Sequence, residues 1–251
     1  MQSAASAVQA RTDNTVLGHS HADHRFFSAM AIAASIAILA GFSRSYFIKA
    51  FTLAPPLPLF VHVHAALFAS WLLLFVTQTL LAARKRLTLH RRLGVAGAIL
   101  AVLLVVGGVA TAIVAARAGY RGVPGQEARD PQIFLIVPLR DITLFAIFAA
   151  AGLGLRRKPQ IHKRLMLLAV TGALMPAGVS RLPGMSHFPP LIGITLLLFL
   201  LACPVYDFVR QRRLYASYLS GALLSALLFA PMTERLASSP TWVRFADWLI
   251  R

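Results

Sequence analysis

The sequence has few charged residues and almost no cysteine. Charged side chains make up 13% of the 251 residues, and only eight residues are Asp or Glu. Soluble domains carry about 25% charged residues, so this composition excludes a soluble class. The one cysteine, Cys203, lies in an apolar run, which argues against a disulfide framework or a thiolate metal site. The sequence also lacks glycine-rich nucleotide loops, zinc-protease motifs and nucleophile elbows.

Long hydrophobic blocks take the place of these features. Hydrophobic residues make up 58% of the chain, and the blocks are long enough to cross about 30 Å of hydrocarbon as helices. We therefore predict an all-α fold, a polytopic transmembrane helical bundle of about seven spans, with six as the nearest competing count. The predicted spans are residues 26–42, 57–82, 93–117, 131–155, 165–181, 190–209 and 216–234.

The two ends of the chain differ from this central region. Residues 1–25 are polar and have no apolar core followed by a cleavage site, so we expect a flexible polar tail on the cytoplasmic side. Residues 26–235 form the predicted transmembrane helical domain. Residues 236–251 mix aromatic and charged side chains, which is typical of an amphipathic tail lying in the membrane interface.

The net charge of +17 resides mostly in short loops. In a membrane protein such loops indicate topology and contact with anionic lipid headgroups, so we expect no nucleic-acid partner. The two most basic loops, 84–92 and 156–164, are predicted to face the cytoplasm. This prediction places the amino terminus in the cytoplasm and the carboxyl terminus in the periplasm, with the protein in a bacterial inner membrane.

A decapeptide occurs twice, at the same edge of two spans. Residues 84–93 read RKRLTLHRRL and residues 156–165 read RRKPQIHKRL; the two copies differ in chemical type only at the fourth and fifth positions. The histidines His90 and His162 lie 162 − 90 = 72 residues apart, about the length of one helical pair with its loops. We therefore predict a duplicated two-helix hairpin, formed by spans two and three and by spans four and five.

The repeat predicts that His90 and His162 lie at equal depth in the membrane. Haem b in a helical bundle needs two imidazoles on facing helices, with cations near its propionates. The cations that follow the two histidines are suited to that role; they are Arg91, Arg92, Lys163 and Arg164. The alternatives are that both histidines bind lipid headgroups at the interface, or that they relay protons or bind a metal ion.

The basic loops leading into Leu89-His90 and Ile161-His162 resemble those of transmembrane b-type cytochromes with a four-helix, two-haem core. The resemblance implies that His90 and His162 are the ligands from the second and fourth core helices, and that His62 or His64 matches the first. Span 131–155 contains no histidine, so the pairing supports at most one bis-histidine haem. The loops also resemble those of uncharacterised bacterial multi-span membrane proteins with duplicated basic–histidine loops.

A second constellation lies in span 131–155. Asp141 is near the predicted bilayer midplane, where an ionised side chain costs at least about 2.5 kcal/mol, so it is a candidate for a proton or ion site. Arg140 is adjacent, and His64 lies at a similar depth, with His62 two residues before it. The alternative is a structural polar clamp, including an internal ion pair at a kink caused by Pro138.

Three function classes remain open. The leading hypothesis is a b-type haem redox or electron-transfer protein whose partner is a quinone or a redox protein, with Arg140, Asp141 and His64 serving protons or quinone. A proton-coupled small-solute transporter would use Asp141 as the coupling carboxylate. A non-catalytic membrane assembly factor would dock its partner on the basic loops.

Overall fold

The regular elements in the described part of this protein are helices. The computed structural model describes residues 2–49, 57–119, 130–185, 187–188, 190–229 and 231–251, and the side chains of these except 2–21 and 231. No strand occurs in these ranges, which confirms the all-α prediction. In chain order the elements are α1 (Gln2–Phe42), the π-helix η1 (Ser43–Ile48), α3 (Leu59–Ala83), α4 (Leu87–Arg117), α5 (Pro131–Gly154), α6 (Pro159–Leu168), the π-helix η2 (Ala169–Leu174), α7 (Met175–Val179), α8 (Pro190–Gln211), α9 (Ala216–Phe229), α10 (Pro231–Ala237) and α11 (Pro240–Ile250).

Within the described residues, five helices are long and apolar enough to cross a membrane. They are Ala22–Ile48, α3, α4, α5 and α8. The predicted span 165–181 falls on α6, η2 and α7 together, and the predicted span 216–234 falls on α9 and α10. Large apolar side chains remain exposed on the bundle surface, such as Leu73 and Val95, as a surface facing lipid tails requires. The chain is an integral membrane helical protein.

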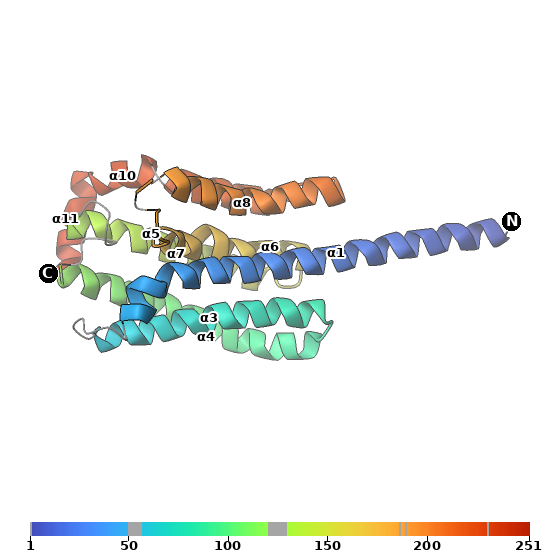
Figure 1. The fold of residues 1–251 in the computed structure, drawn as a ribbon, viewed down its shortest axis with the longest axis horizontal. Coiled ribbons are helices and arrows are strands. Elements are labelled where there is room, and N and C mark those ends of the chain that lie inside the picture. Colours follow the sequence, from blue (N-terminus) through green and yellow to red (C-terminus); the bar gives the residue numbers. More distant parts are fainter. Residues whose placement is uncertain (1, 50–56, 120–129, 186, 189, 230) are drawn as a thin grey trace.

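The helices form a bundle built on two hairpins (Figure 1). Helices α3 and α4 form the first hairpin, α5 and α6 form the second, and α4 packs against α5 between them. Helix α1 packs against α3 and α7, while α8 and α9 pack against η2. The amino-terminal part of α1 extends beyond the bundle, so residues 2–25, expected to be a flexible tail, are helical and continuous with the first span.

The predicted interfacial tail forms α11 at the opposite end of the bundle. Its Trp242 donates a hydrogen bond from Nε1 to the Gln132 carbonyl (2.9 Å), and Asp247 accepts one from the Gln132 side chain (2.9 Å). Phe245 and Trp248 remain exposed. Helix α11 therefore covers the amino-terminal end of α5 with one face and presents aromatic side chains on the other.

The six residues of η2 are all buried and form the centre of the bundle. The π-helix ends at Leu174, two residues before Pro176, which has no N–H to donate to the turn before it. A wider π turn accommodates this missing bond, and such turns occur frequently at functional sites.

A contact without side chains joins α1 and α7. A Cβ added to Gly178 would lie 2.6 Å from the Ile38 Cα. Since that neighbour is backbone, we expect Gly178→Ala to lower the free energy of unfolding in detergent by about 1–3 kcal/mol. Gly193→Ala is the matched control, because a Cβ there meets no atom within 4 Å. Equal stabilities of the two variants would contradict this helix contact.

Candidate functional site

The two repeat histidines lie together, as their equal place in the repeat predicts. His90 is the fourth residue of α4 and His162 is the fourth residue of α6. Their ring centroids are 6.3 Å apart and their ring planes are nearly perpendicular, at 89°. Both residues are half-buried. We call the end of the bundle that carries them and the connections 84–86 and 155–158 the basic end.

Each histidine is held by the preceding helix of its own hairpin. The Nδ1 atom of His90 lies 3.2 Å from the Gln78 carbonyl of α3, and Nδ1 of His162 lies 2.7 Å from the Gly152 carbonyl of α5. The Gln78 side chain adds a third contact by donating from Nε2 to the His90 carbonyl (3.1 Å). The sequence repeat is therefore also a repeat of hydrogen bonds, one set in each hairpin.

These bonds determine which nitrogen of each ring is available. A carbonyl oxygen only accepts, so Nδ1 carries the hydrogen in both rings. In a neutral imidazole Nε2 then keeps its lone pair for a further partner. Histidines that bind metals almost always donate their other N–H in this way, to a backbone carbonyl or a carboxylate. Both rings thus share this one feature with metal-binding histidines.

The four cations beside the histidines differ in their surroundings. Arg91 and Arg92 are exposed. Lys163 forms an ion pair with Asp23 of α1, and Arg164 forms one with Asp207 of α8. Lys163 and Arg164, expected to bind propionates, are therefore already paired with carboxylates of the chain.

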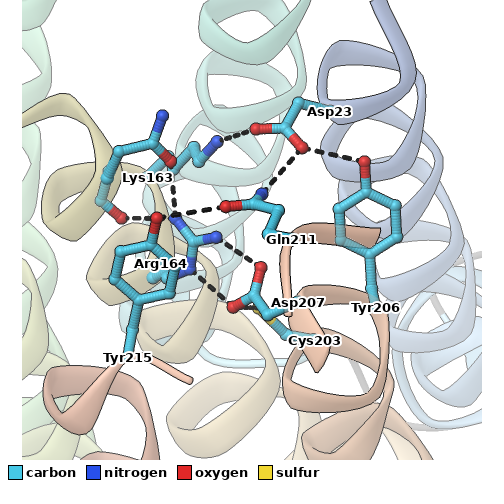
Figure 2. A network of polar contacts seen from close by, with 9 residues as sticks. Asp23, Lys163, Arg164, Cys203, Tyr206, Asp207, Gln211 and Tyr215 are labelled. Carbon is cyan, nitrogen blue, oxygen red and sulfur yellow. Dashed lines mark hydrogen bonds and ion pairs between the residues drawn. The ribbon is translucent and has the colours of Figure 1, made fainter. Parts of the chain in front are cut away.

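These ion pairs belong to a network that joins α1, α6, α8 and Tyr215, the residue just before α9 (Figure 2). Asp23 also accepts hydrogen bonds from the Tyr206 hydroxyl (2.8 Å) and from the Gln211 amide (3.0 Å). The Gln211 side-chain oxygen Oε1 in turn accepts one from the Tyr215 hydroxyl (3.1 Å), and the Tyr215 ring centroid lies 3.6 Å from the Arg164 Cζ. The network holds three segments that are far apart in the chain at the basic end.

Sequence reasoning missed Asp23 and Asp207. Asp207 had a usable signal, because it is an acidic residue inside an apolar run, as Asp141 is. Asp23 had none, since it lies in a polar segment without periodicity.

At the other constellation, Arg140 and Asp141 pair with each other. Arg140 donates from Nε (2.9 Å) and Nη2 (2.7 Å) to Asp141 Oδ1. Its Nη1 donates to the carbonyls of Leu228 (3.2 Å) and Phe229 (3.1 Å) and to the Thr233 hydroxyl (3.2 Å). The internal ion pair considered above is thus present, and it ties α5 to the end of α9 and to α10.

The structure does not bring His62 or His64 into this pair. The Nδ1 atom of His62 lies 3.0 Å from the Tyr46 hydroxyl of η1. His64 packs near Phe68, with ring centroids 6.2 Å apart, and its buried Nδ1 has no hydrogen-bond partner among the described residues. The hydrogen bonds described for Asp141 come from Arg140 and not from His64.

The described ranges contain no group of three or more His, Cys, Asp or Glu residues that could hold a metal ion. The paired histidines are the arrangement with the most definite chemistry, with two rings whose centroids lie 6.3 Å apart and whose Nδ1 atoms are both bound to backbone carbonyls. Compared with known protein families, curated proteins and solved structures, the chain matches none.

Proposed function

We propose that the protein is a membrane b-type haem protein that transfers electrons, with His90 and His162 as the axial ligands of one haem. The observation that carries this proposal is the 6.3 Å separation of their ring centroids. Metal–imidazole bonds of about 2.0–2.1 Å place the centroids of two opposed rings about 6 Å apart.

The donor set fits haem better than a bare metal ion. Haem iron receives four nitrogens from the porphyrin and needs only two axial protein ligands, whereas a structural zinc site needs four. The Gln78 and Gly152 carbonyls orient the two rings, each through Nδ1. When bound, haem supplies a one-electron carrier, and the chain sets its potential through the ligands and the nearby charges.

The cations of the basic end supply the propionate partners and the membrane orientation in this proposal. Arg91 and Arg92 follow His90 on the same helical turn and are not engaged by a described carboxylate, so they are the propionate partners that we propose. We further propose that the basic end faces the cytoplasm of a bacterial cell, because Lys and Arg concentrate in short cytoplasmic loops. The electron partner would then be a quinone in the bilayer or a redox protein.

The absorption spectrum of the purified protein tests the proposal. After expression with added haem, we expect a Soret band that is lost in both His90→Ala and His162→Ala. We expect His162→Gly to regain a low-spin spectrum when imidazole is added, because the free imidazole replaces the missing ligand. His62→Ala and His64→Ala are matched controls and are expected to keep the band. A colourless wild-type protein, or unchanged spectra in both ligand variants, would refute the haem proposal.

The transporter hypothesis finds less support in the contacts. Its coupling carboxylate, Asp141, is held by Arg140, whose guanidinium also binds two carbonyls and a hydroxyl. A carboxylate that loads and releases protons must lose such a partner in each cycle. The ion pair therefore favours the structural interpretation of this site.

A further inference from the structure

A cavity of about 180 Å³, partly open to the outside of the bundle, lies between η2, α8 and α9, and neither of the paired histidines lines it. Its walls are mostly apolar and include Leu196, Leu200 and Phe229. A cavity of about 150 Å³ lined by apolar side chains accommodates benzene. The space therefore suits one six-membered ring with small substituents.

Two hydroxyl groups line this otherwise apolar space. Thr171 of η2 and Ser225 of α9 are 1% and 4% exposed. The Thr171 hydroxyl donates to the Leu167 carbonyl (3.0 Å), and the Ser225 hydroxyl donates to the Gly221 carbonyl (3.0 Å). A hydroxyl has one hydrogen and two lone pairs. Because each of these hydroxyls already donates its hydrogen to a backbone carbonyl, the Thr171 and Ser225 oxygens can only accept a hydrogen bond from a ligand.

A proline lies beside these hydroxyls. Gly172 and Pro176 both line the cavity, and Pro176 has no N–H, so its backbone offers a ligand no hydrogen-bond donor. The polar part of the wall therefore calls for a ligand that donates a hydrogen bond.

We propose that this cavity binds a monocyclic, lipid-soluble molecule that carries a hydroxyl donor, that is, a ligand of the phenol class. Its ring packs among Leu196, Leu200 and Phe229, and its hydroxyl donates to Thr171 or Ser225. The binding site is separate from the histidine pair and does not depend on haem. It goes beyond the proposed function, because it adds a small-molecule site to the far side of η2.

Fluorine NMR on the purified full chain in detergent tests this proposal, with 4-fluorophenol as the probe. The control ligand is 4-fluoroanisole, which has the same fluorinated ring but a methyl ether in place of the hydroxyl donor. We expect saturable binding of both, with 4-fluorophenol about fivefold tighter, as one hydrogen bond of typical strength gives.

Two sets of variants separate the ring site from the hydroxyl site. Gly193 lines the cavity, and a Cβ there meets no atom within 4 Å, so Gly193→Leu is expected to fill the space and abolish binding of both probes. Gly154→Leu is the control, because it has similar open space outside the cavity. The double variant Thr171→Val and Ser225→Ala is expected to keep 4-fluoroanisole binding and to remove the fivefold preference for 4-fluorophenol.

Three results would overturn the proposal. Absence of saturable binding in the wild type would mean that lipid or detergent chains fill the cavity. Equal affinities of the two probes in the wild type would show that the ligand does not need a hydroxyl donor. Binding that survives Gly193→Leu would place the ligand elsewhere. Each result can be read in protein with or without haem.

Discussion

The variant Asp207→Leu is expected to lower the free energy of unfolding by about 3–5 kcal/mol, because it leaves the Arg164 guanidinium buried without its counter-charge. The two side chains are 0% and 1% exposed. Asp207 accepts from Arg164 Nε at 2.8 Å through Oδ2, and its Oδ1 accepts from the second guanidinium nitrogen. Chemical unfolding in detergent micelles measures the loss.

A double variant separates the effect of the unpaired charge on stability from the effect of the altered packing. In the double variant Arg164→Leu and Asp207→Leu no buried charge remains, so we expect it to be more stable than Asp207→Leu alone. The neighbouring pair Lys163–Asp23 is 25% and 15% exposed, and we expect Asp23→Asn to cost less than Asp207→Leu. If Asp207→Leu were as stable as the wild type, the network would not hold α6 to α8.

The second large effect is expected at Arg140. Arg140→Met removes the counter-charge of Asp141, which is 8% exposed, and also the three bonds from Nη1 to α9 and α10. We expect a loss of about 3–5 kcal/mol, since a buried carboxylate without its partner is costly. The measurement is again unfolding in detergent.

Variants of Arg140 and Asp141 show how much the ion pair and the contacts to α9 and α10 each contribute to stability. In the double variant Arg140→Met and Asp141→Leu no charge is left unpaired, and we expect it to recover part of the stability but not the contacts to α9 and α10. Asp141→Asn, by contrast, keeps a hydrogen-bond acceptor for Arg140 and is expected to fold. Complete recovery in the double variant would show that the bonds from Arg140 to α9 and α10 contribute nothing.

The helices were predictable because hydrocarbon admits only segments that satisfy their own backbone hydrogen bonds. Long apolar blocks such as those of α3 and α4 therefore predict helices directly. The split of the fifth predicted span into α6, η2 and α7 was less predictable. The split depends on Pro176. The sequence predicts a kink at this proline, but it does not show whether the helix forms a π turn before it.

The candidate site was predictable only in part. The repeat indicated that His90 and His162 share a depth, since each follows a basic loop at the start of a helix. The partners of their Nδ1 atoms, the Gln78 and Gly152 carbonyls, carry no sequence signal because every residue has a carbonyl. Asp141 was recognised as unusual, and the sequence left open whether its partner was His64 on another helix or its own neighbour, Arg140; the structure shows Arg140.

The sequence by itself determined the class of the protein, because composition and block length depend on the solvent around the chain and not on packing. It also determined that two histidines occupy equivalent places in two hairpins. Only the tertiary structure decided which charges meet. Asp23 and Lys163 are 140 residues apart in the chain, and Arg164 and Asp207 are 43 apart. Such pairs arise from the way helices pack side by side, and helical periodicity specifies which face of a helix is apolar but not which neighbour covers it.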